Sequence, residues 1–169
     1  MIKVWGNYDI QGGFVDIIYK DTITADEFNA IRKSMGWRQH HPEQAQSDID
    51  GNALVIAAYD GDKAIAMAGL RWNGGSFAVM NVLLNPEYQN IGIEQDFSTR
   101  IFDFLRSKLK PGFGIQIDIN VCAGQETLYE NLGFKYITPE NRGIPMFTCL
   151  SNQIEITDKM FKQMAYKEE

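Results

Sequence analysis

Apolar residues in this chain alternate with polar ones, or gather in short β-branched runs, in the segments that we predict as strands. The hairpin signal is strongest where Asp60-Gly61-Asp62 separates two apolar runs, residues 53–59 (ALVIAAY) and residues 64–72 (AIAMAGLRW). Residues 76–84 follow a second turn, so we expect three antiparallel strands here. Further strands are predicted within the first ten residues and at residues 14–20, 115–122, 134–137 and 146–150.

Apolar residues at helical spacing mark the segments that we predict as helices. The first helix begins after Thr24, where Glu27 stands at the spacing of a capping box, and it ends at Gly36. The longest, residues 92–109, connects two predicted strands, and a connection of this length allows them to pair in parallel. Shorter helices are predicted at residues 42–49 and 126–131, and residues 157–166 form either a short helix or a frayed tail.

This order of elements predicts an α/β (α+β) fold, in which helices flank a central mixed, mostly antiparallel sheet. The chain has 169 residues, of which 44% are hydrophobic, and this is the size of one ordinary domain. We therefore expect a single domain over residues 1–169, with an extra N-terminal segment at residues 1–13 and a C-terminal tail at residues 151–169.

The net charge of the chain narrows the range of molecules that it could bind. The net charge of −6 argues against wrapping nucleic acid or docking on anionic lipid. It fits a weak preference for a cationic small substrate, or it serves only solubility. Two cysteines are too few for a disulfide framework, and no apolar run approaches the length of a membrane span or forms an export leader. We expect a cytoplasmic protein with no membrane partner.

The most informative segment is residues 84–94 (LNPEYQNIGIE), where a strand gives way to a short loop and a long helix. Backbone N–H groups and the positive end of a helix converge at such a junction, which makes it a candidate anion site. Gly92 would allow a phosphate to approach the backbone closely.

Two motifs give the sequence a family resemblance. The segment from Leu84 to Glu94 is similar to the pattern V-x-P-E-Y-Q/R-x-x-G-x-G/A, and residues 128–134 (LYENLGF) are similar to F/L-Y-E-x-L-G-F. Together they resemble the GNAT superfamily of acetyl-CoA-dependent N-acyltransferases, and the order of elements agrees over about residues 14–150. The resemblance implies a GNAT-like fold, acetyl-CoA as cosubstrate and no metal.

The resemblance also implies which residues bind the cosubstrate. Backbone amides of the loop would hold the pyrophosphate of coenzyme A, and the free edge of the preceding strand would pair with the pantetheine arm. By position, the loop residues are Gln89, Asn90, Ile91, Gly92, Ile93 and Glu94, and the strand residues are Val82, Leu83 and Leu84.

Glu94 departs from the family pattern, which has Gly or Ala at this position. A carboxylate in the first helical turn suits the helix dipole, but it would repel a pyrophosphate beside it. Three outcomes stay open at this stage. In the first, Glu94 points outward and does not disturb cofactor binding. In the second, it weakens or abolishes that binding. In the third, it occupies the anion site itself.

Tyr129 is the expected catalytic residue. In many GNAT enzymes a tyrosine at this place protonates the departing thiolate, and it also contacts the cofactor. The general base is less defined, because related sequences often carry Asp or Glu where this chain has Asn81. Asn81 cannot usefully accept a proton, although it could hold a water. Asp118 on the neighbouring strand is a weaker candidate.

We expect structural roles for the remaining residues that could take part in binding or catalysis. Trp37 either lines the acceptor site or covers the core, and we favour the core. Adjacent histidines project differently, so His40, His41 and Glu43 predict a solvated loop and no metal site. Cys122 is expected to be a buried thiol.

The expected function is transfer of an acetyl group from acetyl-CoA to a primary amine of a small molecule by direct attack. The alternative is a catalytically impaired GNAT-fold module that binds coenzyme A or a protein, which Glu94 and Asn81 favour. An enzyme that acetylates proteins is a third option. Dimers are common in the family, and the segment after Leu150 could contribute to a homodimer.

Overall fold

The computed structural model describes residues 6–10, 13–73, 76–112, 114–121 and 126–137. The chain divides into two compact units, the first ending at Ile119 and the second beginning at Asn120. The expected single domain over residues 1–169 stays a prediction.

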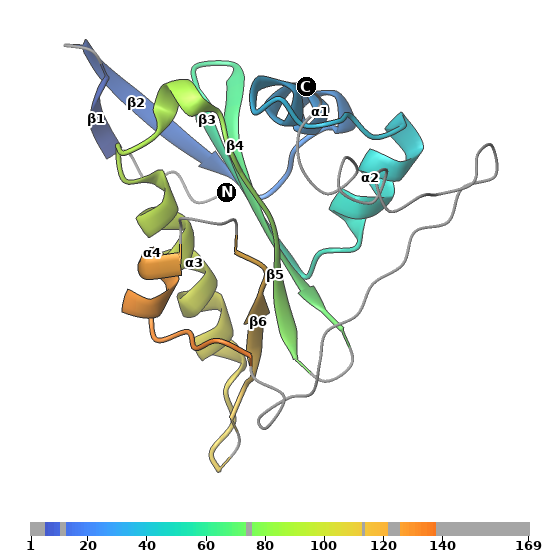
Figure 1. The fold of residues 1–169 in the computed structure, drawn as a ribbon, viewed down its shortest axis with the longest axis vertical. Coiled ribbons are helices and arrows are strands. Elements are labelled where there is room, and N and C mark those ends of the chain that lie inside the picture. The colour runs from blue at the N-terminus through green and yellow to red at the C-terminus, as the bar shows by residue number, and fades with distance from the viewer. Residues whose placement is uncertain (1–5, 11–12, 74–75, 113, 122–125, 138–169) are drawn as a thin grey trace. The chain divides into compact units, whose positions relative to one another are not determined.

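The first unit is built on a six-stranded sheet in which the strands follow chain order from β1 to β6 (Figure 1). Neighbouring strands are antiparallel except for β5 and β6, which are parallel. This confirms the predicted mixed, mostly antiparallel sheet. The strands are β1 (Gly6–Ile10), β2 (Gly13–Lys20), β3 (Leu54–Asp60), β4 (Lys63–Trp72), β5 (Phe77–Leu84) and β6 (Ile117–Ile119).

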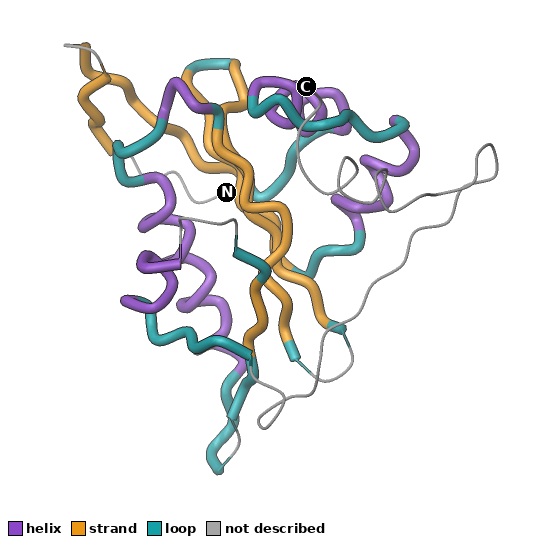
Figure 2. Tube along the Cα trace, viewed as in Figure 1, coloured by secondary structure: helices purple, strands orange, loops and turns teal. Residues whose placement is uncertain are grey.

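Helices cover both faces of this sheet (Figures 1 and 2). On one face, α1 (Ala25–Ser34) and α2 (Pro42–Asp50) bury Phe28, Ile31, Ala45 and Ile49. On the other, α3 (Ile93–Lys108) buries a stripe made of Phe97, Ile101 and Leu105. Each large apolar side chain that is fully buried contributes roughly 1.5–3 kcal/mol, so these two layers supply the driving force of the fold.

Local sequence signals set the helix boundaries. At the start of α1, the Glu27 backbone N–H donates to Thr24 Oγ1 over 3.2 Å, and the Thr24 N–H donates to Glu27 Oε2 over 2.8 Å. This is the predicted capping box. A 3-10 turn, η1 (Pro86–Tyr88), separates β5 from α3. Within the described residues, no helix combines the length and the apolar character needed to cross a membrane.

Two strand predictions need correction. Among the described residues, the strand expected at residues 115–122 is limited to Ile117–Ile119. The strand predicted at residues 134–137 is wrong, because these residues have no regular structure and both Tyr136 and Ile137 are exposed. The apolar sequence is therefore insufficient there without a neighbouring strand to pair with. The elements predicted at residues 146–150 and 157–166 lie outside the described residues.

A β-bulge interrupts the pairing of β4 with β5. Met80 pairs with Gly69 and Leu83 pairs with Met67, so Asn81 and Val82 together face the single residue between them on β4. Asn81 adopts φ +51°, in the left-handed region that bulges and turns require. On its other side, β5 pairs with β6 only from Phe77 to Val79 within the described residues. After Val79, β5 therefore keeps β4 as its described neighbour, with pairing interrupted at Asn81 and Val82 and resumed at Leu83, while its other edge has no described partner.

Gly69→Ala should destabilise the first unit. An added Cβ would lie 2.5 Å from Asn52 Oδ1, and Asn52 cannot yield easily because its Nδ2 donates to the carbonyls of Asp48 and Ile49. We expect a loss of about 1–3 kcal/mol in the free energy of unfolding, measured by urea denaturation. Gly114→Ala is the control, because a Cβ there meets nothing within 4 Å. Equal stabilities of the two variants would contradict the assigned packing.

Candidate functional site

The loop between β5 and α3 is held in left-handed backbone conformations. Asn90 has φ +65° and Gly92, the N-cap of α3, has φ +102°. A φ of +102° suits glycine, because the Cβ of any other residue would clash with the backbone at this angle. Gly92 provides no side-chain cap for the helix. The N-cap residue therefore leaves the first amides of α3 to other acceptors, of which the Glu94 carboxyl reaches its own amide, and this is the geometry of an anion site.

Two buried tyrosines anchor this loop to the sheet. The Tyr88 hydroxyl, on the N-terminal side of the loop, donates to Asp60 Oδ2 over 2.7 Å. Burial, and then the bonded Asp60, raise the pKa of Tyr88 to about 12, so its hydroxyl stays protonated. On the other side, the Tyr19 hydroxyl donates to Asp96 Oδ2 of α3 over 2.7 Å. Both ends of the loop are therefore fixed to strands.

Glu94 lies in the first turn of α3 and is half-buried. Burial raises the pKa of its carboxyl, and its own backbone N–H opposes that shift only in part. The carboxylate therefore stands close to the helix N-terminus, where a bound anion would also be placed. This differs from the outward-pointing, harmless arrangement that the sequence left open.

The strand residues implied by the resemblance have buried or half-buried side chains. Leu83 is fully buried, Leu84 is 6% exposed, and Val82 is half-buried against the core. Only the backbone of this part of β5 is therefore suited to binding a ligand.

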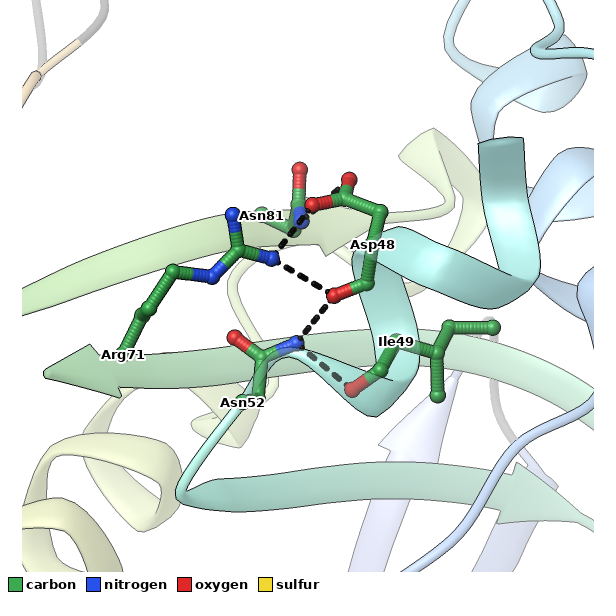
Figure 3. A network of polar contacts seen from close by, with 5 residues as sticks. All are labelled: Asp48, Ile49, Asn52, Arg71 and Asn81. Carbon is green, nitrogen blue, oxygen red and sulfur yellow. Dashed lines mark hydrogen bonds and ion pairs between the residues drawn. The ribbon is translucent and has the colours of Figure 1, made fainter. Parts of the chain in front are cut away.

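A polar network lies beside the bulge, where it joins α2 to β4 and β5 (Figure 3). Arg71 Nη2 donates over 2.7 Å both to Asp48 Oδ1 and to the Asp48 backbone carbonyl. Asn81 Nδ2 donates to the other carboxylate oxygen, Asp48 Oδ2, over 2.9 Å. The side chains of Asp48 and Arg71 are only 20% and 32% exposed. The position at which related sequences carry an acid therefore holds an amide bound to a carboxylate from another element.

Sequence reasoning missed Asp48 and Arg71. A signal exists in α2, where Ala45 and Ile49 face the core and Asp48 lies three residues after Ala45, on nearly the same face. A polar residue beside a buried stripe indicates a polar partner across the interface. The identity of that partner on β4 could not be read from the chain.

Within the described residues, two buried atoms of this region have no hydrogen-bond partner, Asn52 Oδ1 and Arg71 Nε. Each unpaired buried polar group costs about 1–3 kcal/mol. Such groups deserve a functional explanation, because most buried polar atoms in folded proteins are paired.

Three further candidates are Asp118, Trp37 and Cys122. Asp118 accepts a short hydrogen bond from Ser76 Oγ near the start of β5. Trp37 is half-buried and packs against the core under α1 and α2, with the Arg32 guanidinium 5.4 Å from its ring centre. Cys122 lies outside the described residues.

The two histidines have structural roles. The His40 backbone N–H donates to Asn29 Oδ1 over 2.9 Å, and the His41 ring nitrogen Nδ1 accepts from the Glu43 N–H at the start of α2. Burial, then nearby Arg32, lower the pKa of His40. Within the described part of the chain, no cluster of three or more His, Cys, Asp or Glu could hold a metal ion.

Tyr129 belongs to the second unit, where it lies on α4 (Glu126–Asn131). Its side chain is 9% exposed, and its ring packs edge-on against Phe134 at 5.9 Å. The Phe134 N–H donates to the Tyr129 carbonyl over 3.0 Å, which closes the turn after the helix. These contacts place Tyr129 in a local aromatic pair, and its role in catalysis stays a prediction.

Comparison with known proteins points to one family. The sequence matches the acetyltransferase (GNAT) domain family over residues 20–148. Comparison with curated proteins gives no match.

Solved structures with the same fold include several acetyltransferases. A probable acetyltransferase from meticillin-resistant Staphylococcus aureus aligns with a TM-score of 0.66 and 18% identity, covering 79% of this chain and 99% of that one. A GNAT family protein from Streptococcus pneumoniae aligns with a TM-score of 0.59 and 15% identity, covering 81% and 98%. The ribosomal-protein-S18-alanine N-acetyltransferase from Escherichia coli aligns with a TM-score of 0.60 and 19% identity, covering 72% and 79%. At these identities the likeness shows the fold alone.

Glu94→Gln should raise stability at neutral pH. Because burial raises the pKa of Glu94 above 4.5, the folded state favours the protonated carboxyl, and this contribution is complete below the unfolded pKa and is lost as the pH rises through the folded pKa. We expect the variant to melt about 1–2 °C higher near neutral pH, with the difference vanishing below about pH 4. Glu87→Gln, which removes an exposed ion pair with Lys63, is the control and should change little. A Glu94→Gln variant that is less stable at neutral pH would contradict the assigned burial.

Proposed function

This chain belongs to the GNAT acetyltransferase family, and we propose that it transfers an acetyl group from acetyl-CoA to a primary amine by direct attack. Family membership makes it an acyltransferase, and acetyl-CoA is the cosubstrate of the family. What is proposed for this chain is the acceptor, the mechanism and the residues that take part.

The observation that carries the proposal is the left-handed loop at Gly92, which leaves the first amides of α3 without a side-chain cap. Amides in this arrangement bind phosphate oxygens without needing any particular side chain. We assign the pyrophosphate of acetyl-CoA to the backbone of residues 89–94. The tyrosine anchors at both ends of the loop support this assignment, because they hold the amides in place before the ligand arrives.

The free edge of β5 supports the assignment of the pantetheine arm. Leu83 pairs with Met67, and the Asn85 N–H donates to the Ile65 carbonyl over 2.8 Å, so the backbone groups of these two residues face β4. Backbone directions alternate along a strand, so those of Val82 and Leu84 face the opposite edge. No described strand covers that edge beyond Val79. An amide of the acetyl-CoA arm can pair there as an added strand would.

Acetyl transfer needs a neutral amine, support for the oxyanion and a proton for the departing thiolate. A backbone N–H of β5 is suited to supporting the oxyanion. We assign protonation of the thiolate to Tyr129, because a phenol and a thiol have comparable acidity.

For the acceptor we propose a small molecule that carries a primary amine. A protein amine is the second candidate, favoured by the likeness to an enzyme that is named for acetylating an alanine of a ribosomal protein. A catalytically impaired module is favoured by Glu94, which places a carboxylate near the proposed phosphate site. The expected homodimer stays a prediction.

Acetyl-CoA binding depends on Gly92 if the loop is the phosphate site. Gly92→Ala strains a backbone at φ +102° and places a methyl group beside the amides, so we expect the Kd for acetyl-CoA to rise at least about tenfold in calorimetric titration. Glu94→Gln should bind acetyl-CoA more tightly than the wild type, because it removes a like charge.

The control for Gly92→Ala is Gly112→Ala. Gly112 also has positive φ, at +81°, but a Cβ there meets nothing within 4 Å and the residue lies beyond the end of α3. A wild-type protein that fails to bind acetyl-CoA at millimolar concentration would refute the enzyme and favour the impaired module.

Tyr129→Phe should lower the rate of transfer and leave acetyl-CoA binding intact. Loss of a general acid typically costs about 100-fold in kcat, and the aromatic contact with Phe134 survives the substitution. The measurement is steady-state acetylation across a panel of amines that includes small molecules and peptides. An unchanged kcat would show that another group protonates the thiolate.

A further inference from the structure

We propose that Asp48 is a positioning residue for acyl transfer, because it fixes the side-chain amide of Asn81 with its oxygen available to the acceptor amine. This inference rests on the proposed function, which places the acetyl thioester along β5. It concerns the acceptor and assigns no new role in binding acetyl-CoA.

The backbone at Asn81 is the first argument. A residue with φ +51° in the middle of a strand is uncommon, and such conformations persist where the surrounding structure enforces them. Asparagine tolerates this region better than most residues do. The bulge turns Asn81 out of the regular alternation of β5, at the point where pairing with β6 has ended.

The orientation of the Asn81 amide is the second argument. Its Nδ2 donates to Asp48 Oδ2 over 2.9 Å, and an ionised carboxylate can only accept. The amide is therefore fixed with its nitrogen towards Asp48. Its oxygen is at the other end of the amide from the nitrogen that donates to Asp48 (Figure 3). No described residue donates a hydrogen bond to that oxygen in this structure.

Asp48 is itself held firmly, which is the third argument. Arg71 Nη2 bonds both its carboxylate and its backbone carbonyl, and Asn52 Nδ2 bonds the same carbonyl over 2.7 Å. Each carboxylate oxygen therefore has its own partner, Arg71 for one and Asn81 for the other. The carboxylate cannot rotate without losing both bonds.

Chemically, this arrangement orients the acceptor and does not deprotonate it. The Asn81 oxygen accepts one N–H of a neutral amine and directs the nitrogen lone pair towards the thioester carbon. The C–N bond forms, the C–S bond breaks, and the proton lost from nitrogen is balanced by the proton gained by the departing sulfur. The products are an amide and a free thiol, and neither Asn81 nor Asp48 changes its protonation state.

The test is Asp48→Asn, which keeps the shape of the side chain. Arg71 can still donate to the oxygen of the new amide, which leaves an NH₂ group facing Asn81. The Asn81 amide would then turn its oxygen towards that group and present its own NH₂ to the acceptor. We expect kcat/KM for the amine to fall about 10- to 100-fold, with the Kd for acetyl-CoA unchanged.

A compensating exchange separates positioning from mere stability. In the double variant Asp48→Asn with Asn81→Asp, the carboxylate stands on β5 and accepts from the amide on α2, so an accepting oxygen is available to the amine again. We expect this exchange to recover most of the lost rate with the pH profile of the wild type, whereas a role confined to stability would show no recovery and a new general base at position 81 would change that profile. Asp103→Asn, which removes an exposed ion pair with Arg106, is the matched control and should keep full activity.

Three outcomes are distinguishable, with melting temperatures measured for every variant. A wild-type protein that acetylates no amine refutes the proposed function, and the inference fails with it. An active wild type with an equally active Asp48→Asn variant overturns the inference alone. An exchange variant that folds but is no more active than Asp48→Asn also overturns it.

Discussion

The separation of β5 from β6 after Val79 is the constraint on which the rest of the described structure depends. A bulge loosens it from β4 on one side, and its pairing with β6 ends on the other. A strand edge that is left open inside a sheet is a liability unless other elements hold the strand in place. Here the helices hold it: α2 through Asp48 and Asn81, and α3 through the loop that Tyr88 and Tyr19 anchor. The same separation leaves backbone groups open to a ligand.

The features of this arrangement that lower the stability of the fold are concentrated around β5. Asn81 is held in the left-handed region, and Asn52 Oδ1 and Arg71 Nε are buried without partners in the described structure. Glu94 is half-buried with a raised pKa at the start of α3. Each feature lowers stability, and the large cores under α1 and α3 offset that loss elsewhere. A sequence optimised only for folding would have avoided these features, so their clustering marks the region where function dominates.

Local signals in the sequence predicted most of the first unit. The capping box at Thr24, the hairpin around Gly61 and the spacing of Phe97, Ile101 and Leu105 each depend on neighbours in the chain, and each is confirmed. The predicted strand at residues 134–137 failed because a strand depends on a partner that the local sequence does not specify. The contact from Asp48 to Asn81 was invisible for a similar reason, since 33 positions separate them. The resemblance pointed to position 81, but only the structure shows what stands beside it.

In the mechanism proposed above, Asn81 and Asp48 together constrain the kind of amine that this chain can use. Because that mechanism has an amide in place of a base, its rate depends on the fraction of the acceptor that is already neutral. At neutral pH about one in ten α-amino groups is neutral, against about one in 2,500 side-chain amines of lysine type, from their ordinary pKa values. The neutral fraction of an α-amino group is therefore more than about 100 times that of a lysine-type amine, before either amine contacts the protein. An arrangement that orients the amine without deprotonating it therefore favours acceptors of low basicity, whether they are small molecules or the amino ends of proteins.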